Sequence, residues 1–214
     1  MTLSTEQGFP YWLAIETIVQ GWTLAEQGQV EEGIAQMHQG LAAYRATGAE
    51  LQRPSFLALL AEAHRKVGQM EEGLAVLAEA LAQVEKTGER YYEAELYRLK
   101  GTLTLQSKTS LGQVLDKSKT SPKQVQDKSR ASQDKLDDTE KEAEECFHKA
   151  IEIARKQQAK SLELRAVMSL ARLWQQQGKK EEAWQMLAEI YGWFTEGFDT
   201  KDLKEAKALL EELS

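Results

Sequence analysis

Imidazole and thiol groups are the side chains in this sequence most able to do chemistry, and they are few. The chain has three histidines, His38, His64 and His148, and one cysteine, Cys146. A zinc site on one helix needs two imidazoles about one turn apart, as in HExxH, and no two of these histidines have that spacing. Cys146 and His148 are two residues apart, so on a helix they point in different directions and form no thiolate–imidazole pair. The sequence therefore predicts no metal site and no catalytic residue.

Phosphate-binding motifs and paired catalytic carboxylates are also not indicated. No GxxxxGK[ST] or GxGxxG loop follows a predicted strand. Acidic residues are abundant, but they are scattered along predicted helices, as solvated surface residues are. We therefore predict that the protein is not an enzyme and that it uses no cofactor.

Composition excludes several further classes of protein. The 214 residues include 27 Lys and Arg and 34 Asp and Glu, a net charge of −7, which makes nucleic acid an unlikely partner because phosphate neutralisation needs a basic surface. The single cysteine excludes an intrachain disulfide, and the absence of Asn excludes N-glycosylation. No apolar stretch approaches the ~18 residues of a membrane span, and no signal-peptide pattern is present. We expect a cytoplasmic protein without a membrane partner.

Two series of glycines repeat with a period of 40 residues. GQVEEG begins at Gly28 and GQMEEG at Gly68, and GKKEEA begins at Gly178, 110 residues further on. The second series is Gly8, Gly48 and Gly88. Two independent series with one period indicate an internal repeat.

Each period contains apolar residues at helical spacing on both sides of its central glycine. In the second period Leu57, Leu60 and His64 precede Gly68, and a longer set follows it: Met70, Leu74, Leu77, Leu81 and Val84. The glycine suits a left-handed residue in a short turn between antiparallel helices. The Glu pairs after each central glycine fall in the first turn of the second helix, where they complement its dipole. The period is therefore a helical hairpin.

These positions resemble the pattern of the tetratricopeptide repeat (TPR). In the second repeat the matching residues are Leu57, Leu60, Ala61, His64, Gly68, Gly73, Leu77 and Ala80. In the fourth they are Val167, Leu170, Ala171, Trp174, Gly178, Ala183, Leu187 and Ile190. The first repeat matches through Gly21, Leu24, Gly28, Gly33, Met37 and Gly40, and the third is split between Tyr97 and Gly101 and Ala143, Phe147 and Ala150. The resemblance implies that His64 is a packed core residue.

The 40-residue period is longer than the usual ~34 residues, and the closing proline is missing; longer helices account for both. This long-period type is similar to the C-terminal arrays of bacterial signalling ATPases and nucleotide cyclases and of maltose-activator-type regulators. The resemblance implies an all-α fold, a right-handed superhelical solenoid, that binds proteins. We expect one solenoid over 10–214 with repeats at about 10–48, 50–88, 90–158 and 161–197, a capping helix at 202–213, and a remnant of an earlier repeat at 1–9.

The resemblance also implies that the first helix of each repeat lines a concave groove. The groove-facing positions of this sequence include Trp22, Arg65, Lys66, Arg98, Arg165, Met168 and Arg172, together with Ile15, Ile18, Glu26, Glu62, Glu95, Gln106 and Gln176. Its arginines could hold carboxylates, which predicts an acidic or C-terminal-carboxylate peptide as ligand. The alternative is that these cations pair within the chain, with Glu62, Glu95 and Glu163. The Asn-based clamp of some family members is not expected, since the chain has no Asn.

The two ends of the predicted array differ in polarity. The first helix carries a large apolar face with no earlier repeat to cover it, which predicts a partner, a homodimer or a larger native protein, with contact through Trp12, Ile15, Ile18 and Val19. The last helix has one apolar side and one charged side and is expected to act as a cap. We expect Trp184, Trp193, Phe194 and Phe198 to fill the seam beneath it.

The helical pattern is interrupted at 106–138. SKTSLGQVLDK is followed by SKTSPKQVQDK, an 11-residue tandem duplication, and 107–135 holds seven Lys and Arg against three Asp, a net +4 in a chain whose remainder is −11. So few bulky apolar residues predict a flexible loop. The segment is either a basic arm for an acidic partner or an insertion tolerated at a hairpin tip, and the duplication favours the insertion.

Overall fold

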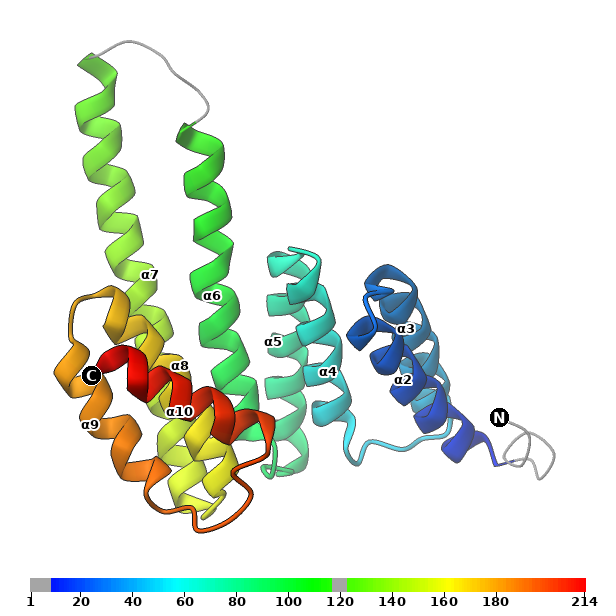
Figure 1. Cartoon of the computed structure of the whole chain (residues 1–214). Coiled ribbons are helices and arrows are strands. Elements are labelled where there is room, and N and C mark those ends of the chain that lie inside the picture. The colour runs from blue at the N-terminus through cyan, green and yellow to red at the C-terminus, as the bar shows by residue number, and fades with distance from the viewer. Residues whose placement is uncertain (1–8, 117–122) are drawn as a thin grey trace. The chain divides into compact units, whose positions relative to one another are not determined.

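A computed structural model describes residues 9–116 and 123–214, and it describes side chains for residues 9–107 and 137–214. All regular secondary structure in these ranges is α-helical. The chain divides into two compact units, Met1–Tyr92 and Glu93–Ser214, and each is described by itself (Figure 1). The all-α prediction is confirmed, whereas the single array over 10–214 stays a prediction.

Each unit is built from helical hairpins. Unit 1 contains α2 (Pro10–Glu26), α3 (Val30–Ala46), α4 (Arg53–Lys66) and α5 (Met70–Thr87). Unit 2 contains α6 (Glu93–Asp116), α7 (Lys123–Lys156), α8 (Lys160–Gln176), α9 (Lys180–Tyr191) and α10 (Lys201–Leu213). The helices pack in chain order as the pairs α2–α3, α4–α5, α6–α7 and α8–α9, and α10 packs on α8 and α9. The predicted hairpins and terminal helix are therefore present.

The short turns inside the hairpins are closed by left-handed residues. Gly28, Gly68 and Gly178 have φ of +94°, +77° and +78°. The amide after each glycine bonds back to the carbonyl five residues earlier, for example from Gln69 N–H to His64 O over 3.0 Å. This is the Schellman arrangement, in which a left-handed residue lets the last carbonyls of a helix find donors.

The helices that follow these turns begin without a side-chain cap. Acidic pairs occupy their first turns instead, at Glu31 and Glu32, Glu71 and Glu72, and Glu181 and Glu182. Each carboxylate near a helix N-terminus stabilises it by roughly 0.3–1 kcal/mol when exposed. The predicted role of the Glu pairs in the hairpin is consistent with this placement.

Small residues set the distance between α2 and α3. A Cβ added to Gly33 would lie 2.8 Å from the backbone N of Ala25, and one added to Gly21 would lie 2.7 Å from Gly33 O. The two backbones therefore touch at this crossing. Larger side chains pack on either side, with Met37 and Tyr44 both 0% exposed. The Tyr44 ring contacts Tyr11 in a tilted arrangement and Phe56 edge to face, with ring centroids 5.4 Å apart in both pairs.

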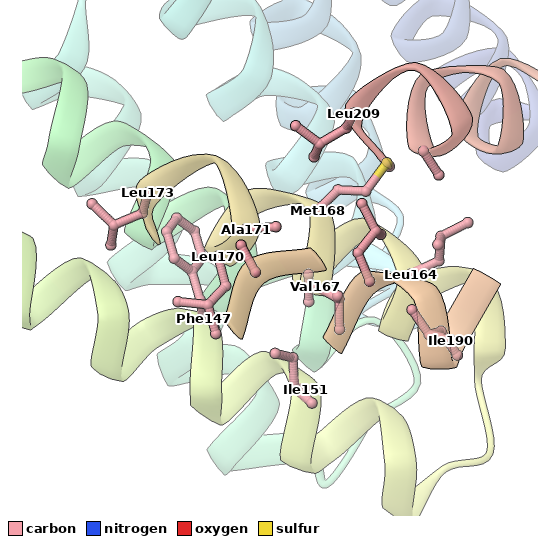
Figure 2. Close-up of a cluster of buried hydrophobic side chains, with 14 of the residues drawn as sticks. Phe147, Ile151, Leu164, Val167, Met168, Leu170, Ala171, Leu173, Ile190 and Leu209 are labelled. Atoms are coloured by element: carbon pink, nitrogen blue, oxygen red, sulfur yellow. The ribbon is translucent and has the colours of Figure 1, made fainter. Parts of the chain in front are cut away.

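The core of unit 2 lies between α7, α8, α9 and α10. Figure 2 shows Phe147 and Ile151 from α7 facing Val167 and Leu170 from α8. Leu187 and Ile190 of α9 belong to the same cluster, as do Leu203, Ala206, Leu209 and Leu213 of α10. The apolar side of α10 is thus buried, and it covers the last hairpin as predicted.

The segment at 106–138, predicted to be a flexible loop, is helical wherever the structure describes it. α6 continues to Asp116 and α7 begins at Lys123, and both run past the ends of α8 and α9 (Figure 1). Residues 117–122, like the predicted repeat remnant up to Gly8, lie outside the described residues. These extensions of α6 and α7 continue helices whose other ends are packed in the core. They therefore need no separate helix nucleation and no apolar face of their own. Apolar periodicity alone could not reveal them.

Candidate binding surfaces

α2 carries a row of large apolar side chains that the rest of unit 1 leaves uncovered or partly covered. Trp12 is 59% exposed and Val19 is 42% exposed, and Ile15 and Trp22 are partly exposed. Their spacings of three, four and three residues place all four on one side of the helix. We call Trp12, Ile15, Val19 and Trp22 the α2 stripe. It unites two surfaces that the sequence predicted separately, the N-terminal partner face and the apolar end of the groove.

Ile18 was assigned to both of those surfaces, and the structure corrects this assignment. Ile18 is 0% exposed and lies on the face of α2 that packs against α3, with Ala14, Gly21 and Ala25. A Cβ on Gly40 would lie 2.6 Å from Cγ1 of Ile18, so Ile18 fills the space that Gly40 leaves. The glycine in the facing helix was the signal, in the sequence, that Ile18 points inward.

The basic groove candidates of unit 1 contact acidic side chains of the same unit. Lys66 Nζ lies 2.5 Å from Glu26 Oε1, which joins the ends of α4 and α2. Arg65 lies 3.8 Å from Glu62 on its own helix. These side chains are partly exposed, so each pair stabilises the fold by no more than about 1 kcal/mol. The pairs do, however, reduce the net positive charge that a ligand would meet.

The basic candidates of unit 2 meet at a buried carboxylate. Glu95 is 1% exposed, and Arg98 donates to it twice, from Nε over 2.8 Å and from a terminal nitrogen over 2.7 Å. Arg165 of α8 reaches the same carboxylate at 2.9 Å. Two guanidinium groups compensate the cost of burying one carboxylate. Arg165 therefore joins α8 to α6, and both arginines pair within the chain, which is the alternative to ligand binding.

α10 occupies the surface assigned to the end of the groove. Arg172 lies 3.2 Å from Glu205 of α10, and Arg165 lies 3.9 Å from Asp202. Met168 is only 3% exposed, and its side chain extends toward α10 near Leu209 (Figure 2). The prediction that Met168 faces the groove is therefore wrong, and Met168 is a core residue. The reason is that α10 packs on α8 as the first helix of a further repeat would.

The aromatic residues of α9 and of the loop between α9 and α10 are more exposed than predicted. Trp193 is 58% exposed, Phe198 46% and Trp184 39%, so these three do not fill the seam beneath α10. Only Phe194 packs, in part, against the core. Lys160 Nζ lies 5.8 Å from the Trp193 ring centroid, a cation–π contact within unit 2.

The histidines and the cysteine take structural positions. His64 is 6% exposed, its Nδ1 lies 2.7 Å from Gln69 Oε1, and its ring lies 5.9 Å from that of His38. Cys146 is buried, and burial raises the pKa of its thiol, which disfavours the nucleophilic thiolate. In the residues with described placement, no three His, Cys, Asp or Glu side chains are grouped so that they could hold a metal ion. None of the helices described there has the length and apolar content that a membrane crossing needs.

Comparisons with known proteins add to this geometry. No protein-family model and no curated protein matches the sequence. Among solved structures, the chain is similar to TPR-like repeats of kinesin-light-chain type from Podosopora anserina. The two are 18% identical, the match covers 95% of this chain and 86% of that one, and the TM-score is 0.60. The chain has the fold of TPR-like helical repeats.

Two further structures match with lower TM-scores and contribute nothing more to the fold assignment. A single-substitution variant of the same Podosopora repeats is 22% identical over 86% of this chain and 94% of that one, with a TM-score of 0.38. The assembly chaperone of RpL4 (Acl4), residues 1–338, is 17% identical over 94% of this chain and 84% of that one, with a TM-score of 0.30.

Proposed function

We propose that this TPR-like chain is a protein–protein interaction scaffold and that the α2 stripe is its main contact surface. The observation that supports this is the exposure of Trp12 and Val19, 59% and 42%, on a helix whose adjacent face packs in the core. Contiguous exposed apolar side chains commonly mark interaction sites. Tryptophan is enriched among the residues that dominate binding energy. Catalysis has no part in the proposal.

The stripe favours an apolar partner surface over an acidic peptide. An acidic peptide would have to compete with Glu95 for Arg98 and Arg165, and with Glu205 for Arg172. Breaking a buried ion pair leaves an uncompensated charge and is costly. The apolar residues of the α2 stripe have no such competitor in unit 1, so a partner gains contact there without displacing one. Binding of an acidic peptide therefore remains the secondary proposal.

The biological setting is proposed from the sequence pattern. The 40-residue period supports a role in a bacterial signalling or regulatory protein, the class whose long-period repeats it resembles. The single cysteine supports a reducing, cytoplasmic compartment, where structural disulfides are rare. Self-association through α2 is the alternative to a foreign partner, since the same stripe serves both.

Affinity capture tests the proposal. The wild-type chain and the Val19→Glu variant are used as baits in extract of the source organism, with Trp193→Glu as a control in another exposed aromatic. We expect Val19→Glu to lose at least one protein that wild type and Trp193→Glu both retain, because a charge in the stripe must be desolvated on binding. Identical sets of captured proteins from all three baits, with no self-association, contradict the proposal.

A further inference from the structure

We infer that the partner of the α2 stripe is a second copy of this chain, bound through an antiparallel pair of α2 helices. The inference rests on the proposed function, which makes the stripe a contact surface, and it names the occupant. A two-fold contact places the same surface of both copies face to face, so that surface must complement itself. The α2 stripe can be tested against this requirement residue by residue.

The stripe is symmetric about its midpoint when the helix direction is reversed. In an antiparallel pair centred between Ile15 and Val19, Trp12 of one copy faces the partner's Trp22, and Ile15 faces the partner's Val19. A large ring therefore meets a large ring at both ends, and two β-branched side chains meet in the middle. The pair therefore does not place two bulky rings opposite each other at its centre, nor two small residues opposite each other at an end.

The spacing of the stripe also suits a partner helix. Steps of three, four and three residues are those of a coiled-coil seam, in which apolar residues recur every 3.5 positions on average. The residues on an adjacent side of α2, Ala14, Ile18, Gly21 and Ala25, are already buried in unit 1. A second helix can thus lie along the stripe without disturbing the hairpin. None of the four stripe residues is charged, so no like charges are desolvated along the seam.

Charge at the ends of α2 favours the antiparallel direction. Glu26 lies one turn beyond Trp22, and the first turn of α2 contains no acidic residue. In the antiparallel pair, Glu26 approaches the positive N-terminal end of the partner helix. In a parallel pair the two Glu26 carboxylates would lie side by side. Lys66 lies 2.5 Å from Glu26, which fixes the position of this carboxylate and offsets part of its charge.

The size of the stripe sets the strength of the dimer. Four side chains, of which Trp12 and Val19 are the most exposed at 59% and 42%, supply less area than the roughly 1,200–2,000 Å² buried in stable complexes. A contact of this size is typical of weak, reversible association, and we expect a dissociation constant on the order of micromolar. The chain is then expected to be monomeric in dilute solution and dimeric when concentrated.

Sedimentation velocity of the full chain from about 1 to 500 µM tests this range. We expect the average mass to rise toward twice that of one chain. Val19→Glu and the milder Trp12→Gln are expected to raise the dissociation constant at least tenfold, with unchanged circular dichroism. Trp193→Glu, which changes a residue exposed to 58% on unit 2, is expected to leave dimerisation unchanged. A single species of monomer mass at all concentrations overturns the inference, as does a dimer that tolerates both stripe variants.

Disulfide trapping tests the direction of the helices. In a Cys146→Ser background, Ile15→Cys is mixed with Val19→Cys under a glutathione redox buffer. Faster crosslinking between these two variants than within either one supports the antiparallel pair, and faster crosslinking within each variant overturns it. The scaffold proposal is separable from this result. If the chain is monomeric but Val19→Glu still loses a captured protein, only the second-copy inference is overturned. If Val19→Glu changes neither sedimentation nor affinity capture, the inference and the scaffold proposal are both overturned.

Discussion

Gly33 is required by the close approach of two helices, whereas Gly28 is required by its left-handed backbone. Substituting each by alanine measures the two effects separately. A Cβ on Gly33 would lie 2.8 Å from the backbone N of Ala25 and still nearer to Gly21 O, so α2 and α3 must move apart. Gly28 has open space around it, and only its φ of +94° opposes a side chain. We expect Gly33→Ala to destabilise unit 1 by about 3 kcal/mol and Gly28→Ala by about 1 kcal/mol.

Urea denaturation followed by circular dichroism measures both variants. Similar losses for the two would show that α2 and α3 do not cross as closely as described. Gln158 provides an internal comparison, because it takes the left-handed conformation with φ of 55° without being glycine. Its turn still forms the hydrogen bond from Ala159 N–H to Ala154 O at 2.9 Å. A non-glycine residue with left-handed backbone is thus tolerated in such a turn, whereas a Cβ at Gly33 would overlap with the backbone of α2.

Glu163 should make stability depend on pH. It is 3% exposed; burial acts to raise the pKa of its carboxyl, but hydrogen bonds from Lys160 and Arg155, both at 2.7 Å, outweigh burial and hold that pKa below its ordinary value. A lowered carboxyl pKa stabilises the fold above the ordinary Glu pKa, and this contribution is lost as the pH falls through the lowered value.

Glu163→Gln is therefore expected to cost about 1–2 kcal/mol near pH 7. The difference from wild type should shrink as the pH is lowered through the acidic range in which Glu163 takes up its proton. Urea titrations at a series of pH values measure this difference. Glu152→Gln is the control, since its carboxylate is about half exposed and its pairs are with Lys156 and Lys149, so it should cost little at any pH. A constant gap for Glu163→Gln would contradict the assignment.

At the scale of the helix, α10 is held by its buried apolar side rather than by its ion pairs. Leu209 is 3% exposed and lies near Met168 (Figure 2), whereas the contacts of Arg172 and Arg165 with α10 are partly exposed. Leu209→Ala should cost about 3 kcal/mol because it removes buried methyl groups and leaves a cavity. The same change at the partly buried neighbour Leu210 should cost about 1 kcal/mol.

Equilibrium urea unfolding distinguishes these two leucines, and equal losses would show that α10 does not dock on α8 through this side. Arg172→Ala is the matching electrostatic test and should change stability by less than about 1 kcal/mol. A larger effect of Arg172→Ala than of Leu209→Ala would mean that charge, and not apolar burial, holds the cap in place.

The helices that the sequence predicted well are those with a local signal. Gly28, Gly68 and Gly178 end one helix and open the next through their left-handed backbone, and the apolar side chains between them repeat at helical spacing. The extensions of α6 to Asp116 and of α7 from Lys123 had no such signal. Their stability comes from the packed bases of the same helices, which a search for apolar periodicity does not register.

The candidate surfaces were predicted less completely than the helices. Trp12 and Val19 are exposed, but Ile18, one residue away from Val19, is buried and faces Gly40. Met168 was predicted to face the groove, but it is buried because α10 packs on α8. Apolar character alone does not separate exposed from buried positions on a helix. The facing residues decide this, and they belong to other segments of the chain.

At the scale of the whole molecule, the segment that contains the extensions of α6 and α7 has a net charge of opposite sign to that of the rest of the chain. The segment 107–135 has a net charge of +4, and the rest of the chain −11. Among the side chains that the structure describes, the buried residues of α6 and α7 include Leu99, Leu103, Phe147 and Ala150, all outside the segment 107–135. The described cores of the units therefore do not depend on the extensions.

Replacing residues 107–135 with a short Gly–Ser linker tests this separation. We expect the free energy of unfolding to change by less than about 1 kcal/mol, because closing a hairpin with a shorter loop alters its closure entropy only slightly. The helical signal in circular dichroism should fall, since most of the removed residues are helical. The isoelectric point should also fall, because the chain loses a net +4. Loss of several kcal/mol would show instead that the extensions stabilise the packing of α6 and α7.

The same variant tests the alternative that the segment 107–135 is a basic arm. If this segment holds an acidic partner, its deletion should weaken capture of that partner, and most at low ionic strength, where screening is weakest. The deletion should leave the dimer formed by α2 intact.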